Sequence, residues 1–227
     1  MRFFFIGFFF IFHQAFSQDL KSQLNFEVLF NNKVVVLGNT YFDSIQNDSI
    51  KINTLKFYIS ELSLEYNDDV KRLENIPIRQ LINLEDPKTL KVKNIGFNVN
   101  DIERIFFTLG LDSLVNVSGA LGGDLDPTNG MYWSWQSGYI NFKMEGVSRN
   151  CKNRKKAFHF HLGGYKSPFI SNKKVTLDFP KKDVVTVQLD LYDFFNKTDL
   201  SKDFKIMSPS KLSNKKSEIL SKSFSIN

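Results

Sequence analysis

Short segments in which apolar and polar residues alternate recur along most of the chain. Residues 24–30 alternate with a period of two, and Asn31-Asn32 follows as a turn before residues 33–37, which predicts a β-hairpin. The apolar positions of residues 50–66 change parity in the middle, which predicts a β-bulge or two strands with a break. Further strands are expected at residues 92–99, 104–109, 139–144, 157–162, 175–179 and 184–191.

Helical periodicity is confined to the C-terminal end of the chain. Residues 208–210, Ser-Pro-Ser, are typical of a helix start, and Leu212, Ile219 and Leu220 follow at amphipathic spacing. Residues 68–86 are polar and predict a long loop that carries a little local structure. About eight or nine strands separated by turn signals predict an all-β protein. We expect a single antiparallel, β-sandwich-like domain with long loops and a short C-terminal helix.

The N-terminal residues have the layout of a secretory signal peptide. The basic Arg2 precedes an apolar stretch at residues 3–12, and residues 15–17, Ala-Phe-Ser, resemble a cleavage site. An apolar helix of this length extends only about 15 Å, roughly half of a membrane's hydrocarbon core. We therefore expect a signal peptide at residues 1–17 and an exported, periplasmic or secreted domain at residues 18–227, with no membrane span.

The composition excludes several classes of protein. The chain has 227 residues, of which 42% are hydrophobic and 15% aromatic, as in folded rather than disordered proteins. Its 30 lysines and arginines outnumber its 24 acidic residues, but both signs are interspersed, so no nucleic-acid partner is expected. The single cysteine, Cys151, excludes an internal disulfide and a cysteine-based zinc or iron–sulfur site.

Two histidines are separated by a single residue in the strand expected at residues 157–162. His159 and His161 project from the same face of that strand, with their Cα atoms about 6.5–7 Å apart. They are the only histidines of the expected mature chain, because His13 lies in the leader. Two imidazoles at this spacing can bind one cation, and imidazole suits copper, zinc or nickel. The pair predicts either a metal site or an exposed histidine pair without a ligand.

Both tryptophans, Trp133 and Trp135, lie two residues apart at the end of a glycine-rich loop. In an extended chain their rings share one face. The pair predicts an aromatic patch, which either closes one end of the sandwich or has a functional role.

The same loop contains acidic residues at nearly alternate positions. Asp124, Asp126 and Asn129 offer oxygen donors in a pattern similar to that of calcium-binding loops. The similarity is partial, because Trp135 stands where an EF-hand loop has its bidentate glutamate. The loop therefore predicts either a hydrogen-bonded turn or a calcium site.

One motif of this region resembles a known family. Residues 125–139, LDPTNGMYWSWQSGY, with His-Leu-Gly at residues 161–163, resemble the MbnP-like family of exported copper-binding proteins associated with methanobactin systems. The segments LKFYIS at residues 55–60 and IMSP at residues 206–209 are also similar to family segments. The resemblance covers nearly the whole expected mature chain.

The resemblance implies a mainly β domain whose copper site combines histidines with a tryptophan oxidised to kynurenine. The family's oxidation is attributed to a di-haem cytochrome c peroxidase-like partner. By position, His161 is the candidate ligand, and Trp133 or Trp135 is the candidate for oxidation. Characterised family sites have a histidine close to the modified tryptophan, whereas residues 131–139 contain none, so we expect His159 to substitute for it.

These observations predict an exported copper-binding or metal-handling protein with no catalytic activity of its own. The alternative is a metal-free interaction module whose exposed Trp/Tyr patch docks the di-haem peroxidase-like partner or another ligand. A hydrolase that uses one of the histidines with a carboxylate is a third alternative, for which no nucleophile motif is present.

Overall fold

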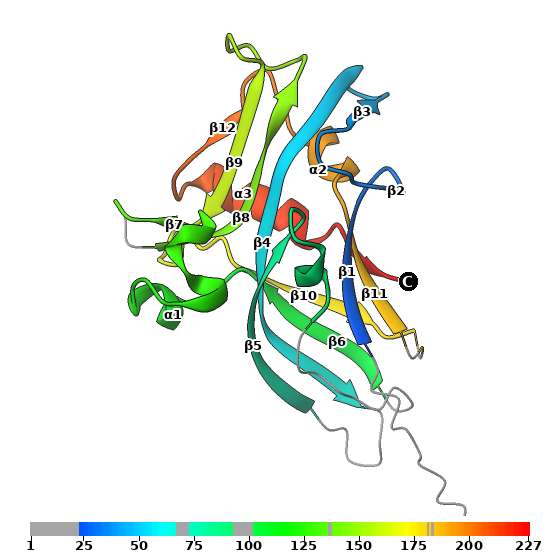
Figure 1. Cartoon of the computed structure of the whole chain (residues 1–227), viewed down its shortest axis with the longest axis vertical. Coiled ribbons are helices and arrows are strands. Elements are labelled where there is room, and N and C mark those ends of the chain that lie inside the picture. The colour runs from blue at the N-terminus through cyan, green and yellow to red at the C-terminus, as the bar shows by residue number, and fades with distance from the viewer. Residues whose placement is uncertain (1–22, 67–72, 93–101, 136–137, 181, 183) are drawn as a thin grey trace, which may run out of the picture.

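A computed structural model gives the structure of the protein (Figure 1). It describes residues 23–66, 73–92, 102–135, 138–180, 182 and 184–227. The expected signal peptide and most of the strand expected at residues 92–99 lie outside these residues.

Two β-sheets form the framework. The smaller sheet has the strand order β13 (Phe224–Ile226), β11 (Val184–Asp190), β1 (Gln23–Phe30) and β2 (Lys33–Val34). The larger sheet has the order β10 (Lys173–Asp178), β6 (Ile102–Leu109), β4 (Asp48–Tyr66), β8 (Gly138–Ser148), β9 (Ala157–Gly163) and β12 (Lys205–Ile206). Three more strands pair with β4 or β8, namely β3 (Thr40–Asp43), β5 (Leu73–Asn83) and β7 (Tyr132–Trp133).

The long strand β4 is the central strand of the larger sheet (Figure 1). At residues 56–57 it pairs with β5 and β8 at once, and at residues 59–65 it pairs with β5 and β6. Strand β5 therefore follows one edge of β4, while β8 and β6 share the other edge. The expected parity change is confirmed as a bulge at Glu61, which has φ +54° and interrupts the pairing register.

Aromatic side chains fill the space between the two sheets. Phe26 of β1 packs on Phe57 of β4 and Phe107 of β6, with ring centroids 6.1 Å and 5.6 Å apart. Phe224 of β13 contacts the same two rings, at 6.2 Å and 5.2 Å. All four rings are buried, and this arrangement confirms the all-β, sandwich-like fold. Two strand pairs, β1–β11 and β9–β12, are parallel.

The expected C-terminal helix is confirmed as α3 (Lys211–Ser221). The Ser210 hydroxyl caps it by accepting a 3.0 Å hydrogen bond from the Ser213 amide. The other helical elements are short: η1 (Pro87–Leu90), α1 (Ser113–Val117), η3 (Gly123–Leu125), η4 (Pro127–Asn129) and α2 (Tyr192–Asn196). In the part of the chain that the structure describes, no helix is long and apolar enough to cross a membrane.

The prediction of a loop at residues 68–86 was wrong for most of that segment. Residues 73–83 form β5, which pairs with β4 from Lys56 to Glu65. Pro77 argued against a strand at the sequence level, because proline lacks the amide hydrogen that a central strand needs. Here Pro77 lies opposite the Glu61 bulge, and β5 pairs with β4 alone among the described residues, so that amide is not required.

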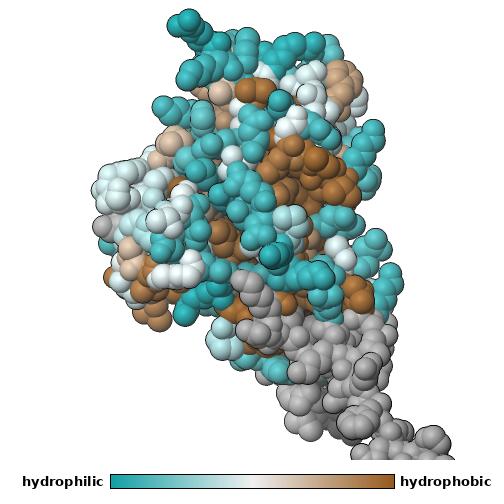
Figure 2. Space-filling view, viewed as in Figure 1, coloured by the Kyte–Doolittle hydropathy of each residue, from teal (hydrophilic) through white to brown (hydrophobic). Residues whose placement is uncertain are grey.

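The outer face of the larger sheet carries a second, smaller apolar cluster. It includes Tyr58 of β4, Trp133 of β7 and Tyr139 of β8, all buried beneath the loop that contains η3 and η4. This cluster fixes β7 against the sheet beside β8 and β9. On the face seen in Figure 2, apolar side chains also gather near β2, where Val34 and Val36 are more than half exposed.

Candidate metal centre

Strands β8 and β9 align four polar side chains on the outer face of the larger sheet. In their antiparallel register, Lys143 lies opposite His161, and Glu145 lies opposite His159. The intervening residues of β9, including Phe160, point into the sandwich core. The alternation of strand side chains therefore places both histidines on one face, as the sequence predicted.

Glu145 joins the two histidines into one group. Its Oε1 atom lies 2.6 Å from Nε2 of His161 and 3.7 Å from Nδ1 of His159. One ligand atom from each of the three residues lies within 4.8 Å of the other two. Two imidazole nitrogens and a carboxylate oxygen form a donor set that suits copper, zinc or nickel.

The two histidines differ in their exposure to solvent. The side chain of His161 is 8% exposed, whereas that of His159 is 42% exposed. Burial lowers the pKa of His161, although its hydrogen bond to Glu145 acts in the opposite direction. The carboxylate can only accept a hydrogen bond, so Nε2 of His161 donates it in the metal-free protein, and a metal ion bound between the two residues would replace this proton. His161 is thus held as a neutral imidazole, the form that binds metals.

Lys143 adds a positive charge to this group. Its Nζ atom lies 3.6 Å from Oε1 of Glu145 and donates a 3.2 Å hydrogen bond to the carbonyl of Gly130. Burial raises the pKa of Glu145, but the hydrogen bond from His161 and the charge of Lys143 outweigh it, and the pKa is lowered. Glu145 is therefore anionic at neutral pH.

The ring of Trp133 lies on the same face of β9 as the two histidines. A β-carbon at Gly163 would come within 2.5 Å of Cζ3 of Trp133, so the indole covers the position two residues after His161. Trp133 is buried, and its Nε1 atom has no hydrogen-bond partner in the structure. Trp135 is 65% exposed, and its ring centroid lies 5.8 Å from that of Trp133. The tryptophan pair therefore extends from the buried face to solvent.

The side chains of the acidic loop form hydrogen bonds within the protein. Asp126 caps η4 by accepting from the amide and hydroxyl of Thr128, at 2.8 Å and 2.6 Å. Asp124 accepts a 3.1 Å hydrogen bond from the Leu81 amide, and the side-chain nitrogen of Asn129 donates to two loop carbonyls. These bonds account for the loop as a turn, and calcium binding by it stays a prediction.

Comparison with known proteins identifies the family. Residues 18–211 match the MbnP family. The chain belongs to that family. It also resembles a solved structure, MbnP from Methylosinus trichosporium, with a TM-score of 0.56 and 15% sequence identity over 79% of this chain and 78% of that one. A comparison with curated proteins found no match.

Membership in the MbnP family agrees with the motif at residues 125–139. Sequence reasoning did not find Glu145 or Lys143 among the chain's many charged residues. The sequence nevertheless contained a signal for them. Glu145 and Lys143 alternate with Phe142 and Met144 in a strand adjacent to the histidine strand.

Proposed function

We propose that this MbnP-family protein binds one copper ion at the group formed by Glu145, His159 and His161. The observation that carries the proposal is the convergence of three donor residues from two adjacent strands within 4.8 Å. Sites with imidazole nitrogens generally bind Cu²⁺ with higher affinity than they bind other divalent first-row metals. The family's association with methanobactin and copper supports copper as the cargo.

The protein acts as a metal-handling protein in this proposal, not as an enzyme. It is exported to the periplasm or the cell exterior, in agreement with the signal-peptide pattern at its N-terminus. His159 is the ligand through which metal enters, because it is the more exposed imidazole. Glu145 orients His161 through the 2.6 Å hydrogen bond before the metal binds, and in the proposed site its carboxylate becomes a ligand and contributes negative charge.

Trp133 is the better candidate for oxidation to kynurenine. Its ring covers Gly163 on the histidine face, and Nε1, the atom that becomes the kynurenine amine, is buried without a partner. Trp135 projects to solvent beside it, where a di-haem peroxidase-like partner can make contact and, in this proposal, catalyse the oxidation with dioxygen or peroxide as the oxygen source and formate as the leaving group.

The exposure of Trp135 also supports a second candidate function. An exposed tryptophan whose ring centroid lies 5.8 Å from that of Trp133 forms a surface typical of protein interaction sites. In this alternative the protein is a metal-free module that docks the same partner or another ligand through the aromatic patch.

The two functions are separated by intact-mass and metal analysis of the protein exported by its native host. Copper at about one ion per chain, lost in a His159→Ala/His161→Ala double variant, supports the first function. A mass gain mapped to Trp133 adds the proposed oxidation. An unmodified chain that lacks copper and binds none when copper is added would contradict the first function and favour the interaction module.

A further inference from the structure

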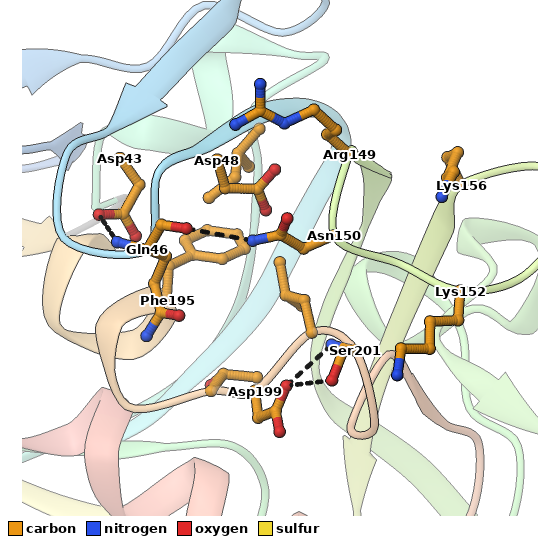
Figure 3. A pocket seen from close by; sticks show the side chains of 13 residues that line it. Asp43, Gln46, Asp48, Arg149, Asn150, Lys152, Lys156, Phe195, Asp199 and Ser201 are labelled. Carbon is orange, nitrogen blue, oxygen red and sulfur yellow. Dashed lines mark hydrogen bonds between the residues drawn. The ribbon is translucent and has the colours of Figure 1, made fainter.

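A second potential ligand site lies apart from the histidine group. A cavity of about 330 Å³ is formed where the β3–β4 turn, the β8–β9 connection and the loop after α2 meet (Figure 3). Cavities that bind small molecules have volumes of about 300–1,000 Å³. None of the three proposed metal ligands lines this cavity.

A buried carboxylate with an unused acceptor atom lines one side of the cavity. The side chain of Asp43 is fully buried, and its Oδ1 atom accepts hydrogen bonds from the amides of Ile45 and Gln46, at 2.9 Å and 3.1 Å. Its Oδ2 atom is also buried but has no hydrogen-bond partner. An unsatisfied buried acceptor destabilises the fold unless a donor reaches it, so this atom indicates a missing donor.

A second buried carboxylate lies next to the first, on the neighbouring strand. Asp48 pairs with Asp43 in the β3–β4 register, is fully buried, and accepts hydrogen bonds from the Ser49 amide and the Ser148 hydroxyl. Within the described residues, neither aspartate forms an ion pair. Two buried carboxylates without a cation favour a ligand that brings a positively charged donor.

The other side of the cavity is basic. Figure 3 shows Lys152 and Lys156 across the cavity from Asp43, whereas Arg149 extends next to Asp48. All three basic side chains are exposed. The ammonium groups of the two lysines make no hydrogen bond or ion pair to the part of the chain that the structure describes. This side is suited to a carboxylate on the ligand.

Apolar side chains lie between the two charged sides. Ile50, Phe195 and Leu200 line the cavity and are themselves buried. A bare metal ion suits the cavity less well, since Asp43, Asp48 and Asp199 do not bring three oxygen atoms within 4.8 Å of one another as the Glu145 group does. The carboxylates on one side, the lysines on the other and the apolar residues between them favour a ligand with a cationic end, an anionic end and an apolar part.

We propose that this cavity binds a free α-amino acid with an apolar side chain. The ligand's ammonium group lies on the side of Asp43 and Asp48, where its charge offsets the two buried carboxylates, and its carboxylate faces Lys152 and Lys156. The apolar side chain of the ligand contacts Phe195 and its apolar neighbours. This site is independent of copper binding.

The test uses the purified mature chain and calorimetric titration with leucine as the probe. Leucine is compared with 3-methylbutylamine, which lacks the carboxylate, and with 4-methylpentanoate, which lacks the ammonium group. We expect saturable binding of leucine and at least about tenfold weaker binding of both analogues, because each loses one charge-assisted interaction. Calcium chloride serves as the cation-only probe.

Variants assign the binding to the cavity. Asp43→Asn should weaken leucine binding by about tenfold. Lys152→Gln should weaken it by only about several-fold, because Lys152 is exposed. Asp193→Asn and Lys211→Gln, which do not line the cavity, are matched controls and should bind as the wild type does. Lys152→Gln keeps the test decisive if Asp43→Asn does not fold. Absence of leucine binding, equal binding of the analogues, unchanged binding by a folded Lys152→Gln variant, or binding of calcium alone overturns the proposal.

Discussion

A β-carbon placed on Gly163 would lie 2.5 Å from Cζ3 and 2.7 Å from Cη2 of Trp133, both well inside van der Waals contact. The same atom would lie 2.7 Å from the backbone carbonyl oxygen of Tyr139, which cannot move without disturbing β8. The indole can therefore pack against β9 at this position only because residue 163 has no side chain. This contact fixes the position of Trp133 relative to His161, two residues earlier on the same strand face.

Gly163→Ala should displace the Trp133 ring and destabilise the protein. Overpacking a well-packed region costs about 1–3 kcal/mol, and chemical unfolding measures this loss. The displacement itself is measured by selectively excited tryptophan fluorescence in a Trp135→Phe background, where Trp133 is the only tryptophan. Gly122→Ala is the matched control, because nothing lies within 4 Å of the added carbon. Equal stability of the two alanine variants would contradict this packing.

Glu145→Gln should weaken copper binding by at least about 10–100-fold, since the loss of a group that only orients a ligand already costs affinity of that order and Glu145 is also a proposed ligand. Glutamine keeps a hydrogen-bond acceptor for His161 but removes the negative charge 2.6 Å from its Nε2 atom. Competition titration with a chelator of known affinity measures the change. Glu218→Gln, on the exposed side of α3, is the matched control. If both variants bind copper equally well, Glu145 does not belong to the site.

The framework of the fold was predictable because most strands carry their own alternation. Residues 24–28 and 158–162 alternate strictly between apolar and polar side chains, which suffices to define a strand with one buried face. Strand β5 was not predictable from that rule, because its proline and its partly exposed isoleucines, Ile76 and Ile78, suit an edge strand beside a bulge. That environment exists only after β4 has folded.

The site was predictable only in part, for a similar reason. His159 and His161 were found because they lie on the same strand and are the only histidines of the expected mature chain. Glu145 is one of 24 acidic residues, and only the β8–β9 register selects it as the partner of both histidines. Trp133 and Trp135 were expected to be equivalent, but pairing of β7 with β8 buries the first and leaves the second in a turn.

Lys143→Met should strengthen copper binding by about three- to tenfold. The ammonium group, 3.6 Å from Glu145, repels an incoming cation, and methionine preserves much of the side-chain length while removing the charge. The gain should shrink at high ionic strength, because the side chain of Lys143 is partly accessible to screening ions. Copper affinities measured at low and high salt test both statements. A weaker affinity in the variant would instead mean that the hydrogen bond of Lys143 to Gly130 is needed to hold the site together.

The metal-free protein should lose stability as the pH falls below about 6.5, the ordinary pKa of histidine. Burial lowers the folded-state pKa of His161, so between that value and 6.5 the unfolded chain binds a proton that the folded chain does not. Stability from this residue is therefore fully present above pH 6.5 and declines until the folded-state pKa is passed. The lowered pKa of Glu145 acts in the same direction, but only below its ordinary value of about 4.5.

Urea unfolding of wild type and His161→Gln between pH 8 and pH 5 isolates the histidine contribution. The free energies of unfolding should converge as the pH falls, and a constant difference across this range would show that protonation of His161 is not linked to folding.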